Sequence, residues 1–148
     1  MKKTILCLLG ITVLLAASIS ILAETATYDK YLTAADVEKV TGLKGLTRKV
    51  DGRELKFTEK SLVLNVKFQG AKAYKLNKET KEYVKGEVAG VGEEAFYGPA
   101  ANPQYVLIFR KKDFCVRIYT YIDTNDPSKT VLTMAQLIAL GKVVASRI

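Results

Sequence analysis

The side chains best suited to catalysis are scarce in this sequence. The chain has no histidine, so Ser-His-Asp and Cys-His nucleophile systems are excluded, and with them the commonest zinc and haem ligand sets. After residue 23 the serines are Ser61, Ser128 and Ser146, and none stands in a GxSxG setting. The composition therefore argues against an enzyme and predicts no catalytic residue, no metal and no cofactor.

Carboxylates are the remaining candidate acid–base groups. Glu93 and Glu94 follow a Gly-x-Gly turn in VAGVGEEAFYGP, and paired carboxylates can cleave glycans without histidine. Adjacent residues of a strand point to opposite faces, so these two acids are not expected to converge. A concave pocket with two converging acids would favour an enzyme acting on envelope glycans, whereas a flat aromatic and basic patch would favour binding.

The same stretch is the most distinctive part of the chain. Gly90 and Gly92 are followed neither by a third glycine at dinucleotide-binding spacing nor by GK[ST], so a tight turn before a strand accounts for them. The functional alternative is a loop that contacts a ligand. Together with a charged hairpin tip and a tyrosine-bearing strand, it forms the candidate recognition surface. The predicted binding residues are Glu93, Glu94, Phe96, Tyr97, Arg110, Lys111, Lys112, Arg117, Tyr119 and Tyr121.

Two helices are predicted from the same start pattern. Thr33 with Asp36, and Thr133 with Gln136, fit a capping box, in which each side chain bonds the other residue's backbone N–H. Gly42 is suited to end the first helix. The pattern predicts helices over residues 33–41 and 133–146, the second with an apolar face at three- and four-residue steps.

Between these helices the hydrophobic period changes to two. Residues 62–69 alternate apolar and polar, residues 55–57 indicate a preceding strand, and residues 105–110 and 114–121 flank a charged turn; residues 71–86 are ambiguous. The order predicts an α+β fold, an antiparallel sheet with the N-terminal and C-terminal helices packed on one face. Each half contains a capped helix and a hairpin, so a duplication stays open.

Residues 1–23 have the arrangement of a bacterial secretory signal. Lys2 and Lys3 precede an apolar run from Ile5 to Leu22, and the small residue Ala23 follows. We expect cleavage near Ala23, one domain over residues 24–148, and a periplasmic or secreted location. The run of 18 residues approaches the roughly 20 that span a bilayer, so the alternative is a retained inner-membrane anchor over residues 5–22.

The charge balance bears on partners. The chain carries 23 basic and 15 acidic residues, a net charge of +8. In a cell envelope this favours an anionic component, a lipid headgroup or a glycan; a protein partner is the alternative, and nucleic acid is not expected. The lysines at 72, 75, 78, 81 and 85 would form either an anion-binding band or a solvated face. Cys115, alone outside the leader, is either buried or pairs with another chain.

The turn VAGVGEEAFYGP, followed by FRKKDFCVRI, resembles a pattern of small exported bacterial proteins and lipoproteins of unknown function. In these a turn of glycine, any residue, glycine, an acid, an acid or any other residue, and alanine precedes a strand, a short charged turn and another strand. The resemblance covers residues 88–118 and implies export and the fold, with no catalytic residue to transfer. Those proteins often have glycine at the hairpin turn, where this chain has Lys112.

These observations lead to one expected function and two alternatives. We expect an exported binding or accessory domain without catalytic function. The alternatives are a histidine-free, carboxylate-dependent enzyme acting on envelope glycans, and an envelope protein tethered by residues 5–22.

Overall fold

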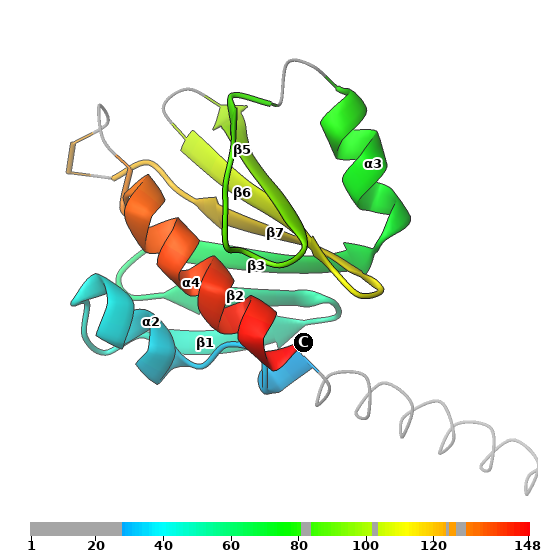
Figure 1. Cartoon of the computed structure of the whole chain (residues 1–148). Helices are drawn as coiled ribbons and strands as arrows, with labels where there is room; N and C mark the ends of the chain where they lie inside the picture. Colours follow the sequence, from blue (N-terminus) through cyan, green and yellow to red (C-terminus); the bar gives the residue numbers. More distant parts are fainter. Residues whose placement is uncertain (1–27, 81–83, 102–103, 124, 127–129) are drawn as a thin grey trace, which may run out of the picture.

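The computed structural model describes residues 28–80, 84–101, 104–123, 125–126 and 130–148, and within them three longer helices accompany a sheet (Figure 1). The expected leader and Lys81 lie outside the described residues. Along the chain the elements are α2 (Ala34–Thr41), β1 (Thr47–Asp51), β2 (Glu54–Thr58), β3 (Leu62–Gly70), α3 (Lys72–Glu79), β4 (Gly86–Glu87), β5 (Glu94–Ala101), β6 (Gln104–Lys111), β7 (Phe114–Thr120) and α4 (Met134–Arg147).

The described strands form one antiparallel sheet of seven strands in the order β1-β2-β3-β7-β6-β5-β4. Two meanders, β1-β2-β3 and β4-β5-β6-β7, meet where β3 pairs with β7, for example Val66 opposite Ile118. The expected α+β class and antiparallel sheet are confirmed. Because β3 and β7 lie side by side, residues about fifty positions apart in the chain share one surface.

The main core lies between the sheet and the helices α2 and α4, which cover the same face (Figure 1). Val37 of α2 and Leu140 of α4 are buried there with Phe57, Phe68 and Ile118 of the strands. Such burial is the main favourable contribution to folding, about 25 cal/mol per Å² of apolar surface. The prediction that the terminal helices share one face is confirmed.

Both helices start as the sequence predicts. The Thr33 hydroxyl accepts a bond from the Asp36 N–H and the Asp36 carboxylate accepts one from the Thr33 N–H, and Thr133 and Gln136 repeat the exchange. Gly42 ends α2 in the left-handed conformation, with φ of 79°. Local side-chain bonds within one turn therefore fix these boundaries.

The ambiguous segment forms α3, which packs on the opposite face of the sheet. Tyr74 of α3 is buried against Phe96, Ile108 and Cys115 in a second, smaller cluster. Cys115 belongs to this cluster and the adjacent Val116 to the main core, so the two clusters lie on opposite faces. No helix among the described residues is long and apolar enough to cross a membrane.

Candidate functional site

The Gly-x-Gly turn and the hairpin tip meet at Arg110. The Arg110 guanidinium contacts a Glu93 carboxylate oxygen at 2.8 Å and a Glu94 carboxylate oxygen at 3.1 Å. The expectation that the two acids point apart is wrong. Strand β5 begins only at Glu94, and Gly92 before it has φ of 61°, so Glu93 is not held in the alternation of the strand.

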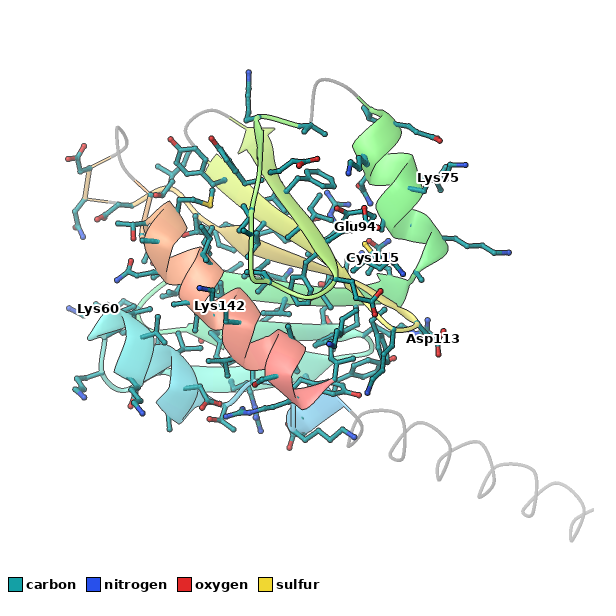
Figure 2. All side chains as sticks on the ribbon, in the orientation of Figure 1. Lys60, Lys75, Glu94, Asp113, Cys115 and Lys142 are labelled. Atoms are coloured by element: carbon teal, nitrogen blue, oxygen red, sulfur yellow. The ribbon has the colours of Figure 1, made fainter. Side chains whose placement is uncertain are left out.

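The helix α3 adds a second cation to this cluster. The Lys78 ammonium lies 3.5 Å from a Glu94 oxygen and 3.4 Å from a Glu87 oxygen. Beneath it, the Tyr74 hydroxyl is buried without a hydrogen-bond partner among the described residues, and burial, with the nearby Glu94 carboxylate, raises the pKa of Tyr74 to about 12. Figure 2 shows Glu94 and Cys115 between α3 and the strands. The acids here are neutralised by cations and join α3 to the sheet.

Phe96 and Tyr97, two of the predicted binding residues, lie on opposite faces of the sheet. Phe96 is fully buried under Tyr74, with ring centroids 5.4 Å apart, so its assignment to a binding surface is wrong. The sequence does not reveal this burial, because the helix that covers Phe96, α3, forms from a segment whose pattern is ambiguous. Tyr97 alternates with Phe96 and so belongs to the opposite face, where its half-buried ring lies against Gly86 of the short edge strand β4.

The charged turn between β6 and β7 is fixed by its own contacts. Lys112 adopts φ of 48°, its N–H donates to a Glu93 carboxylate oxygen at 3.0 Å, and its ammonium contacts the Ile148 carbonyl at the end of α4. Lys111 precedes it at the end of β6 and is half-buried. These contacts give the tip a structural role.

The second face of the sheet is apolar under α3 and polar beyond it. Residues Asn65, Lys67 and Gln69 alternate with the buried apolar side chains of β3, so they lie on this second face, next to Arg117 and Tyr119 of β7. Arg117 and Tyr119 lie side by side, with the guanidinium carbon 4.9 Å from the Tyr119 ring centroid. Tyr121, half-buried, follows the end of β7. We call Glu54, Asn65, Lys67, Gln69, Arg117 and Tyr119 the polar sheet face.

Glu54 of β2 organises the polar sheet face. Its carboxylate contacts the Lys67 ammonium at 2.9 Å and accepts a bond from the Asn65 amide at 3.2 Å. The bond from Lys67 is the main cause that lowers the pKa of Glu54 below its ordinary value. The Asn65 Oδ1, Gln69 Oε1 and Arg117 Nε atoms are buried without a hydrogen-bond partner among the described residues, which is uncommon and calls for a reason.

A hollow of about 690 Å³ opens at the α3 end of the polar sheet face. Its lining combines charged groups, an amide and one apolar helix surface, and it is broad and open to solvent. The residues around it are Asp51, Arg53, Glu54, Lys67, Phe68, Gln69, Gly70, Lys72, Ala73 and Leu76.

Two acids converge at this hollow, although the sequence pointed to others. Asp51 and Glu54 are cross-strand partners in β1 and β2. The Lys56 ammonium, 2.7 Å from Asp51, lowers the pKa of Asp51, as Lys67 does for Glu54. A glycosidase needs one carboxyl with a raised pKa to protonate the leaving group. Both carboxylates are held ionised, so the pair suits binding better than acid catalysis.

Sequence reasoning missed the residues that line this hollow. The polar half of the 62–69 alternation did carry a signal, but that pattern alone does not separate a solvated face from a binding face. Within the described residues no group of three or more acidic or cysteine side chains could hold a metal ion. Comparisons of the chain with protein-family models, curated proteins and solved structures found no significant match.

Proposed function

We propose that this chain is an exported, non-catalytic binding domain and that its ligand lies on the polar sheet face. One observation carries the proposal: in the described structure, helices cover one face of the sheet and only part of the other, and the uncovered part holds buried polar atoms without partners beside a hollow of about 690 Å³. Such atoms cost free energy in the unliganded protein.

The chemistry of this surface fits a polar ligand, for which we propose a glycan of the cell envelope. Carboxylate, ammonium and amide groups from Glu54, Lys67 and Gln69 supply acceptors and donors for hydroxyl groups. Asn65 and Gln69 each hold a free acceptor oxygen, and Arg117 a free donor, which small side-chain rotations would turn toward a ligand. The export expected from residues 1–23 places such glycans within reach.

The rival function, a carboxylate enzyme acting on such glycans, has less support. It needs a proton donor near the ionised pair Asp51 and Glu54, and the lysines beside them lower both carboxyl pKa values. The same arrangement that disfavours protonation favours hydrogen bonding to sugar hydroxyls, because ionised carboxylates are the stronger acceptors.

Titration of the protein recovered from cell envelopes with soluble muramyl-glycan fragments, followed by NMR amide shifts, tests the proposal. We expect the largest shifts at Lys67, Gln69 and Arg117. Lys67→Met should weaken binding about tenfold, the value of one charge-assisted hydrogen bond, and Lys142→Met, exposed on α4, should leave it unchanged (Figure 2). Shifts centred on α4, equal losses in both variants, or no binding would overturn the proposal. Release of reducing ends would establish the rival enzyme.

A further inference from the structure

The outer surface of α3 carries an unusual side chain. Leu76 is 67 % exposed, and among the described residues the other large hydrophobic side chain that stands out is Tyr105, 40 % exposed near the start of β6. The eight-residue helix α3 packs on the sheet through Tyr74, its buried residue. The exposed Leu76 side chain therefore adds little to the packing of this helix. Leaving its side chain in water forgoes the favourable burial that leucine normally provides.

Lysines surround this leucine on the helix. Lys72 and Lys75 precede it, both exposed, and the structure shows no ion pair for Lys72 among the described residues. Lys75 contacts Glu79 at 3.7 Å, but both side chains are so exposed that water and salt screen the pair. In Figure 2, Lys75 lies on the side of α3 away from the strands. We call Lys72, Lys75 and Leu76 the α3 outer surface.

This surface lies at the end of the domain where the chain arrives from residues 1–27. The hollow beside Leu76 shares Arg53, Gln69 and Gly70 with a smaller hollow of about 190 Å³, and Tyr28 lines the smaller one. If residues 5–22 stay in the membrane, the five residues 23–27 span at most about 18 Å when extended. The described part of the domain then begins within that distance of the membrane.

From the exposed leucine and the weakly paired lysines beside it, we propose that the α3 outer surface docks on an anionic membrane. Lysines attract acidic headgroups, and an apolar side chain between them enters the interface, as in helices that lie on membranes. Among the described residues, this helix joins the most exposed leucine to cations that are unpaired or weakly paired. The α3 outer surface borders the hollow of the polar sheet face through Lys72 and Leu76, whereas Lys75 lies outside that hollow. The inference itself does not rest on a glycan ligand.

A reporter on position 76 tests the docking. Leu76→Cys, labelled with an environment-sensitive fluorophore in a chain that also carries Cys7→Ser, is mixed with phosphatidylcholine vesicles with and without phosphatidylglycerol. Cys115 is fully buried and does not compete for the label. The matched control carries the label through Tyr105→Cys. We expect a blue shift at position 76 only, only with phosphatidylglycerol, and reversed by salt, since exposed charges are screened within about 10 Å at 0.1 M.

Unlabelled variants give the magnitude by vesicle co-sedimentation. Each lysine near an anionic surface contributes about fivefold in affinity, so Lys72→Gln with Lys75→Gln should weaken binding about 25-fold. Leu76→Ser should weaken it about tenfold. Lys39→Gln with Lys44→Gln, exposed on or next to α2, is the charge-matched control and should have no effect.

Three results would overturn the inference: no shift at position 76 on anionic vesicles at low salt, an equal shift at position 105, or equal losses in both lysine pairs. If soluble glycerol phosphate prevents vesicle binding as effectively as competing vesicles do, the surface binds a small anion and the membrane proposal is wrong. The glycan titration of a Lys75→Gln variant should be unchanged, because Lys75 does not line the hollow beside the polar sheet face, so the two proposals can fail independently.

Discussion

Asp36 and Arg147 join the start of α2 to the end of α4, and their removal is the sharpest test of how this fold is held together. The Arg147 guanidinium meets the Asp36 carboxylate with two contacts, at 2.6 and 2.7 Å. The same carboxylate accepts the Thr33 N–H at 2.8 Å in the capping box. One acidic side chain thus fixes a helix end and pins the C-terminal helix across the first.

The magnitude follows from the geometry and the exposure of the pair. The Arg147 and Asp36 side chains are 35 % and 20 % exposed, so the cost lies below the 3–5 kcal/mol of a broken buried pair. Two short parallel contacts raise it above a single exposed pair. We expect Arg147→Met to lose about 1–2 kcal/mol of unfolding free energy. Asp36→Ala should lose about 2–3 kcal/mol, because it also removes the return bond of the cap.

The assay is a double-mutant cycle by urea unfolding. Wild type, the two single variants and the double variant give a coupling energy, expected at about 1 kcal/mol at pH 7. Arg147 lowers the pKa of Asp36 well below its ordinary value. The stabilisation is therefore full above the unfolded carboxyl pKa, near 4, and declines as the pH falls toward the folded pKa. A coupling below about 0.3 kcal/mol at pH 7, or one that does not change on acidification, would refute the reasoning.

Three further predictions concern individual residues. Gly92→Ala should lose about 2–4 kcal/mol, because φ is 61° and a Cβ would lie 2.4 Å from the Arg110 carbonyl oxygen; Gly42→Ala, with φ of 79° and open space, should lose only about 1 kcal/mol in the same unfolding assay. Burial raises the pKa of the Cys115 thiol to about 11, so in a chain that carries Cys7→Ser, Ellman's reagent at pH 8 should react only after urea unfolding, and rapid reaction of the folded protein would contradict this. Lys112→Gly should raise the unfolding free energy by about 0.5 kcal/mol, because glycine adopts φ of 48° without the strain that a lysine has there. A lower unfolding free energy would show that the Lys112 contact with the end of α4 outweighs the strain.

The correct sequence predictions all depend on interactions between residues a few positions apart in the chain. The capping boxes at Thr33 and Thr133 act between residues three positions apart, and the alternation along residues 62–69 fixes which side chains face the core. Turn signals act over similarly few residues, so Gly92 was assigned to a turn and has the positive φ that such a turn requires. Interactions of this kind are encoded in adjacent residues and can be read without knowing the fold.

The features that the sequence did not predict depend on contacts between residues far apart in the chain. Phe96 was placed on a surface because nothing in its neighbourhood shows that Tyr74, 22 positions earlier, covers it. Glu54 and Lys67 meet across β2 and β3, and Lys67 lies beside Arg117 only because β3 pairs with β7. A polar residue on a strand is compatible with solvent or with a ligand until its neighbours across the sheet are known.

The sequence by itself determined the α+β class, the two capped helices, the strand alternation and the lack of histidine chemistry, because each depends on composition or on contacts within a turn or strand. The tertiary structure decided where the second layer lies. By placing α3 over part of the sheet, it buries Phe96, leaves the polar sheet face open beside a hollow, and exposes Leu76 among lysines. The position of α3 depends on packing between segments far apart in the chain, so no local sequence pattern predicts it.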